Sequence, residues 1–172
     1  TNVSFVLTAD LVPRCDGVFT NKKELTCSIQ VADCMPIYFA HLSENVFGLV
    51  HVGWRGLVDG ILEESAALLS KNGYKLSDFE IVIGPSIQKC CFEVRDDIIK
   101  KFKSEFIIRA NQNGVYKVDL QKYAFSKMAH MGFEESNIEL SNDCTFCLQE
   151  KYHSFRRDGK DSGRMLGLIG SS

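Results

Sequence analysis

The sequence that decides the fold is MPIYFAHLSENVFGLVHV, residues 35–52. Two apolar runs, 35–40 and 46–52, flank the polar segment 42–45. Each run has the length of a single strand, and polar residues between two such runs are typical of a turn. We therefore predict a β-hairpin whose two strands are 35–40 and 46–52.

This hairpin brings a thiol and an imidazole close together. With its turn centred near Ser43 and Glu44, Cys34 and His51 come within about one residue of direct opposition, where Cβ atoms lie roughly 5 Å apart. One zinc ion can bridge such a pair, because zinc–sulfur and zinc–nitrogen bonds are about 2.3 and 2.0 Å long. From the geometry alone, three interpretations stay open: a small buried thiol beside a strand-end histidine, a zinc site, or a thiolate nucleophile with a histidine base.

Other runs along the chain predict further strands and helices. Alternating apolar and polar residues, or short apolar stretches, predict strands at 25–31, 80–83 and 137–140. The C-terminal tail is apolar again at 165–169. Apolar residues at helical spacing predict helices; these are 57–72, stopped by Gly73, 94–106, and 119–131, with Asp119 as N-cap and Gly132 as the stop. This alternation predicts a layered α+β domain.

The composition excludes several classes of protein. The chain has 172 residues, the size of a single domain over 1–172, and its 45% apolar and 24% charged residues exclude disorder. It contains no apolar run of about 18 residues, so we expect no membrane span. The net charge of −2 provides no general basic field for nucleic acid. Seven cysteines, an odd number, predict reduced thiols and a cytoplasmic protein.

Two arginine-containing segments are candidate anion sites. Residues 53–56, GWRG, join the predicted hairpin to the helix at 57–72, and a glycine-flanked helix N-terminus suits an anion that Arg55 would also bind. The alternative is a tight turn with its tryptophan in the core. Arg156, Arg157 and Arg164 form a second group, which is either an anion clamp acting with Arg55 or a solvated basic surface.

Four further cysteines occur as an adjacent pair, Cys90-Cys91, and as a CxxC pair, Cys144 and Cys147. One CxxC without a second pair at zinc-ribbon spacing is a weak metal signal. We expect buried, inert thiols here, and a structural zinc shared by the two pairs is the alternative.

Four ordered motifs resemble a single family. They are ADCMPI at 32–37, HVGWRG at 51–56, GPSI at 84–87 with CCFEV at 90–94, and DCT at 143–145 with SFRR at 154–157. The family is labelled multicopper polyphenol oxidase, or laccase-domain, and its members are regarded as zinc-dependent purine nucleoside phosphorylases with adenosine deaminase activity. The resemblance extends from near Ala9 to the C-terminus.

The resemblance implies an α+β fold, a layered sandwich with a large mixed sheet, similar to that of the cytotoxic-necrotizing-factor-like cysteine hydrolases. It also implies catalysis on adenosine, inosine, guanosine or methylthioadenosine with phosphate, and it implies Zn²⁺ as the cofactor, with copper as the weaker alternative. Cys34 and His51 match two metal ligands of the family, and both would be catalytic together with Arg55. Our candidates to hold phosphate are Arg55 and one or two of Arg156, Arg157 and Arg164.

The same resemblance places a third metal ligand, a histidine, before Thr1. No histidine precedes His41 in this sequence, so we expect that the chain lacks an N-terminal segment of the full-length protein. The proton donor to the purine is open, with Asp33 and Glu93 as candidates.

Three alternatives to this function remain. Cys34 and His51 would also serve a cysteine hydrolase or deamidase. A copper-dependent polyphenol oxidase is less favoured, because four histidines cannot fill a multicopper centre. A metal-free interaction module is the non-enzymatic alternative.

Overall fold

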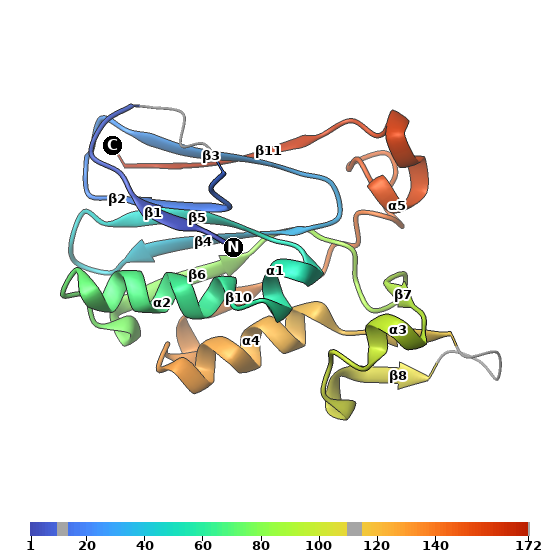
Figure 1. Cartoon of the computed structure of the whole chain (residues 1–172). Coiled ribbons are helices and arrows are strands. Elements are labelled where there is room, and N and C mark those ends of the chain that lie inside the picture. The colour runs from blue at the N-terminus through green and yellow to red at the C-terminus, as the bar shows by residue number, and fades with distance from the viewer. Residues whose placement is uncertain (10–13, 110–114, 172) are drawn as a thin grey trace.

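A large mixed sheet forms the centre of the molecule in a computed structural model that describes residues 1–9, 14–109 and 115–171 (Figure 1). In spatial order its six strands are β1 (Val3–Phe5), β2 (Gly17–Thr20), β5 (Phe47–Val52), β4 (Met35–His41), β6 (Phe79–Ile83) and β10 (Ile138–Leu140). Strands β1–β2 and β6–β10 pair in parallel, and the other neighbours are antiparallel. This confirms the expected α+β fold with a mixed sheet.

The predicted hairpin is present as β4 and β5, and its register places the two candidate ligands. Pro36 pairs with His51 and Met35 with Val52. One further step along this register brings Cys34 opposite Gly53. This is the register expected for a turn centred near Ser43 and Glu44, but Cys34 lies two residues from direct opposition to His51, where about one was expected. Because the side-chain period of a strand is two, the register still places the thiol and the imidazole on the same face, as diagonal neighbours.

A second, two-stranded sheet covers the face of the main sheet to which His51 belongs. It consists of β3 (Thr26–Val31) and β11 (Met165–Gly170), paired antiparallel. Cys27, Phe47 and Leu49 are buried between the two sheets. The apolar tail segment is thus a strand that returns to pair with an early part of the chain.

Helices cover the opposite face (Figure 1), where α2 (Ile61–Lys71) and α4 (Leu120–Met131) pack on the main hydrophobic core. Helix α4 is as predicted: the Asp119 carboxylate accepts a hydrogen bond from the Lys122 backbone N–H, and Gly132 ends the helix with φ 101°. The predicted helix over 57–72 begins earlier and is divided, because Gly60 has φ 95° and separates α1 (Trp54–Val58) from α2. None of the described helices is long and apolar enough to cross a membrane.

The predicted helix over 94–106 was wrong. This segment contains the end of β7 (Glu93–Val94), the short helix α3 (Asp96–Ile99) and a 3₁₀ turn, η2 (Ser104–Phe106). Strand β7 belongs to a small antiparallel sheet with β9 (Tyr116–Val118) and β8 (Ile107–Arg109). The remaining short elements are η1 (Leu76–Asp78), η3 (Glu135–Asn137), α5 (Phe155–Asp158) and η4 (Gly159–Asp161).

The main sheet is closely packed at Gly48 on β5, which gives a first prediction. A Cβ atom at this position would overlap the ring of Phe19, which is fully buried. Overpacking of a core costs typically 1–3 kcal/mol, so we expect Gly48→Ala to destabilise the fold by about that amount. Urea unfolding measures it, and an unchanged midpoint would show that the Phe19 ring moves aside freely.

Candidate active site

Five of the residues expected from the sequence to bind metal or phosphate line one cavity of ≈ 400 Å³. They are Cys34, His51, Arg55, Arg156 and Arg164. The cavity lies where the β4–β5 hairpin, the start of α1 and the segment between α5 and β11 meet. The rest of its lining is largely apolar and aromatic, consisting of Gln30, Ala32, Asp33, Gly53, Trp54, Ile87, Phe92, Leu120 and Phe155.

The thiol of Cys34 sits close to the backbone of Gly53, since a Cβ atom there would be 2.9 Å from Cys34 Sγ. Burial, helped by the Asp33 carboxylate, raises the pKa of the thiol to about 11. Burial also lowers the pKa of His51, although the Asp16 carboxylate opposes this. Among the described residues, neither the thiol nor the His51 ring has a hydrogen-bond partner. A sulfur and a neutral imidazole facing one cavity in this way are donors that fit zinc.

The three cavity arginines are each placed against an aromatic ring. Such contacts hold a guanidinium in one orientation. One Nη group of Arg156 donates to the Glu93 carbonyl, and one of Arg164 donates to the carbonyls of Ser162 and Gly163, so the other N–H groups are the ones that could bind an anion. Two of the guanidinium groups, on Arg55 and Arg164, are near enough to Cys34 to lower the pKa of its thiol, against the larger effect of burial. From Cζ to ring centre, the pairs are Arg55–Trp54 at 4.7 Å, Arg156–Phe92 at 5.4 Å and Arg164–Phe155 at 5.8 Å.

Arg157 is placed differently from the other arginines, and it is not among the residues that line the cavity. Its guanidinium donates to the backbone carbonyls of Thr145, Phe146 and Tyr152 at 2.9–3.1 Å, and to the carboxylate of Asp158. These bonds fasten α5 to the turn that follows β10. The geometry therefore gives Arg157 a structural role, and it leaves Arg156 and Arg164 as the members of this group that could hold phosphate.

Asp33 and Glu93, the two candidate proton donors, also have other partners. The Asp33 carboxylate accepts hydrogen bonds from the Thr145 hydroxyl at 2.7 Å and from the Arg156 backbone N–H at 2.6 Å, and it is buried. It joins the turn before β4 to the C-terminal segments. Glu93 does not line the cavity and faces Lys117, with its side chain 53% exposed. Asp33 lines the cavity with its carboxylate held by these two hydrogen bonds, whereas Glu93 lies outside the lining.

The different placements of Arg157 and Arg164 give a second prediction. We expect Arg157→Met to destabilise the fold by about 2–4 kcal/mol, because it removes donors to three backbone carbonyls. Arg164→Met should leave stability nearly unchanged, since within the described residues its exposed guanidinium donates only to the carbonyls of Ser162 and Gly163, its neighbours in sequence. Urea unfolding of both variants tests this, and equal destabilisation would contradict it.

Comparison with known proteins identifies the relatives of this chain. All of residues 1–172 match the family described as multi-copper polyphenol oxidoreductase laccase. The chain belongs to this laccase family. Purine nucleoside phosphorylase YlmD of Geobacillus stearothermophilus is 34% identical over 169 residues, covering 94% of this chain and 62% of that protein. A purine nucleoside phosphorylase of Haemophilus influenzae is 35% identical over 161 residues, covering 90% and 64%.

The fold of the family agrees with that of this chain. The crystal structure of the hypothetical protein YfiH of Bacillus licheniformis superposes with a TM-score of 0.86 at 30% identity, covering 92% of this chain and 62% of that one. This laccase-family chain thus spans about three fifths of the length of the relatives that it matches.

Two aromatic residues of the site were not among the residues expected from the sequence. Phe92 and Phe155 line the cavity of this laccase-family chain. The guanidinium of Arg156 lies over the Phe92 ring, and that of Arg164 lies over the Phe155 ring. Both occur inside the family motifs, CCFEV and SFRR, which was the signal available in the sequence. Trp54, considered either an anion-site neighbour or a core residue, is half-buried at the cavity wall.

Proposed function

We propose that this cavity is the active site of a zinc-dependent purine nucleoside phosphorylase that also deaminates adenosine. The observation that carries the proposal is the single cavity lined by a thiol, an imidazole and three guanidinium groups, among aromatic rings. The names of the relatives, purine nucleoside phosphorylases, support the same class of substrate. The proposed substrates are adenosine, inosine, guanosine and methylthioadenosine, with phosphate as the second substrate.

Cys34 and His51 would hold the zinc, as two of the three protein ligands that a catalytic zinc commonly has. We propose that the third is a histidine from a segment that precedes Thr1 in the full-length protein. When bound, zinc lowers the pKa of a coordinated water to about 7, which supplies the nucleophile that deamination needs. Copper is the weaker proposal, because the four histidines of the sequence cannot fill a multicopper centre.

The chain's own residues would bind and orient the two substrates. The guanidinium groups of Arg55, Arg156 and Arg164 provide paired N–H donors for phosphate, and their charge offsets that of the anion. Aromatic rings such as Trp54 and Phe92 offer flat apolar surfaces for a purine. Together they would hold phosphate and nucleoside side by side, which removes much of the entropic barrier to attack at the sugar.

A cysteine hydrolase using Cys34 and His51 is the competing function. Its first requirement is a hydrogen bond from thiol to imidazole, and the two side chains are diagonal on the hairpin and not hydrogen-bonded in this structure.

The free state of all seven cysteines fits the proposed cytoplasmic location.

The experiment is a product assay by mass spectrometry on the full-length protein, with each nucleoside supplied with and without phosphate. Free base and ribose 1-phosphate formed only with phosphate would establish phosphorolysis, and inosine formed from adenosine without phosphate would establish deamination. No product from any nucleoside, in protein shown to carry zinc, would refute the proposal. A covalent adduct of Cys34 with a substrate-like electrophile in metal-free protein would then favour the hydrolase.

A further inference from the structure

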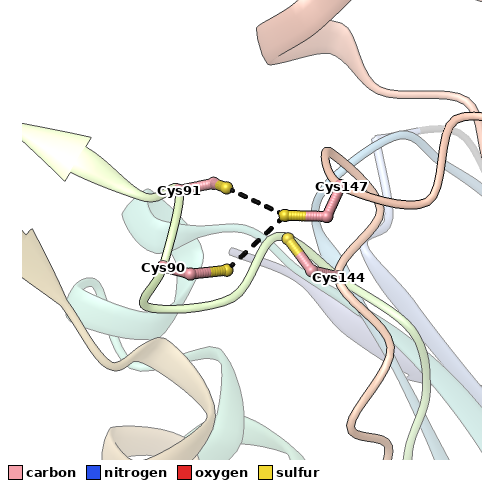
Figure 2. A group of neighbouring side chains, drawn as sticks. All are labelled: Cys90, Cys91, Cys144 and Cys147. Atoms are coloured by element: carbon pink, nitrogen blue, oxygen red, sulfur yellow. Dashed lines mark hydrogen bonds between the residues drawn. The ribbon is translucent and has the colours of Figure 1, made fainter.

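A second group of potential metal ligands lies outside the cavity. The Sγ atoms of Cys90, Cys91, Cys144 and Cys147 all lie within 4.8 Å of one another (Figure 2). Cys144 is buried, Cys91 is half-buried, and Cys90 and Cys147 are exposed. The expectation that these would be buried, inert thiols was therefore wrong for the two exposed residues.

The fold explains why residues so distant in sequence meet here. Strands β6 and β10 are parallel neighbours, with Ile83 opposite Leu140, so the chain leaves both at the same edge of the sheet. The parallel pairing continues beyond the strands as a bridge between Ser86 and Cys144. The turns that carry Cys90-Cys91 and the CxxC pair then run side by side (Figure 2).

The spacing of the sulfurs matches one tetrahedral ion better than a covalent bond. Four sulfurs bound at about 2.3 Å to one tetrahedral zinc lie roughly 3.8 Å from one another. Cys147 Sγ is 3.8 Å from Cys90 Sγ and 3.3 Å from Cys91 Sγ. A disulfide would bring one pair to about 2.05 Å and leave the other two thiols unused.

The surroundings also suit a structural metal. The backbone N–H of Gln88 approaches Cys144 Sγ at 3.5 Å, a contact that supports a thiolate ligand. The exposure of Cys90 and Cys147 gives an ion a path of entry from solvent.

We propose that Cys90, Cys91, Cys144 and Cys147 bind one zinc ion as four thiolates, in a structural site separate from the catalytic cavity. Each thiol gives up its proton to solvent when the metal binds. Four protein ligands close the coordination sphere, so this site has no open position for a substrate.

The proposed zinc would stabilise one wall of the cavity. Ile87 and Phe92, which flank the adjacent cysteines in sequence, both line the cavity. Thr145, next to Cys144, donates the hydrogen bond that holds Asp33 beside Cys34. Loss of the ion would release the two turns that these contacts depend on.

The test is the zinc content of the full-length protein, measured by elemental mass spectrometry after dialysis. Cys147→Ser should carry one zinc fewer than the wild type, whereas Cys15→Ser, a cysteine whose Sγ instead contacts the Gly17 carbonyl at 2.8 Å, should match the wild type. Wild-type zinc content in Cys147→Ser would overturn the proposal, as would iron in place of zinc.

Alkylation of the wild type tests the same site without a variant that has to fold. With zinc bound, the exposed thiols of Cys90 and Cys147 should resist iodoacetamide and become reactive only after a chelator is added, as peptide mapping would show. Rapid alkylation before chelation would refute the metal site. An intact mass lower by two hydrogen atoms, together with a cross-linked peptide in the map, would show a disulfide instead.

The Cys34→Ala variant separates this proposal from the proposed function. This variant lacks a ligand of the catalytic zinc, so a chelator should remove from it only the zinc bound by the four clustered cysteines. We expect the chelator to lower the melting temperature of Cys34→Ala, and added zinc to restore it. An unchanged melting temperature would show that this group binds no stabilising metal, whatever the activity of the wild type.

Discussion

Cys34→Ala is expected to lower kcat/KM for phosphorolysis by more than about 100-fold while the fold is retained. Changes to groups that merely support a zinc ligand cost about 10–100-fold, and this substitution removes the ligand itself. Cys34 is half-buried in the turn between β3 and β4 and makes no hydrogen bond to the described residues, so the effect on stability should be below about 1 kcal/mol.

The control for this prediction is Cys27→Ala, which removes the same atoms from a buried cysteine of β3 between the two sheets. It should retain activity at a small cost in stability. Steady-state kinetics with adenosine and phosphate, zinc content and urea unfolding are measured on both variants. Wild-type kcat/KM in Cys34→Ala would remove Cys34 from the chemistry.

Gly53→Ala should lower kcat/KM by about 10–100-fold, although alanine is normally a mild substitution. Its new Cβ atom would be 2.9 Å from Cys34 Sγ, closer than such atoms pack, so the thiol has to move away from its position in the cavity. Gly53 has φ −80° and ψ 168°, which alanine adopts readily. The expected loss therefore comes from displaced sulfur and not from backbone strain.

Gly56→Ala provides the matched control, three residues further on and inside α1. A Cβ atom there would meet Ile61 at 3.6 Å, an ordinary contact, and alanine favours a helix over glycine by about 0.5–1 kcal/mol. Zinc affinity and kcat/KM should fall in Gly53→Ala and stay unchanged in Gly56→Ala. An equal effect of the two substitutions on kcat/KM would argue against the steric explanation.

The local parts of this fold were predictable because they depend on neighbouring residues. The hairpin followed from two apolar runs and a polar turn, and α4 followed from its capping residues, Asp119 and Gly132. The helix over 94–106 failed because Val94, Ile98, Phe102 and Phe106 provide only one apolar residue per turn. Three of them are buried, but each belongs to a different short element or turn. Their spacing of four residues therefore reflects separate contacts with the core and not one face of a helix.

The long-range parts could not be predicted from spacing. Nothing in the local sequence reveals that β6 and β10 are parallel neighbours, and only this pairing brings Cys90-Cys91 to the CxxC turn. The different roles of Arg156 and Arg157 have a similar cause. They are adjacent residues of α5 and point in different directions, so one lines the cavity while the other binds backbone carbonyls.

The pairing of β3 with β11 has a consequence for the order of folding during synthesis. Thr26 pairs with Gly170, and Met165 with Val31, so this sheet closes across most of the chain. Contacts between such distant residues form slowly, since a long loop has to close first. Gln30 near the end of β3, Ala32 just after that strand and Arg164 just before β11 all line the cavity. A nascent chain can therefore build its helix-covered sheet on the ribosome, but it acquires a complete cavity only after residues 164–170 have emerged.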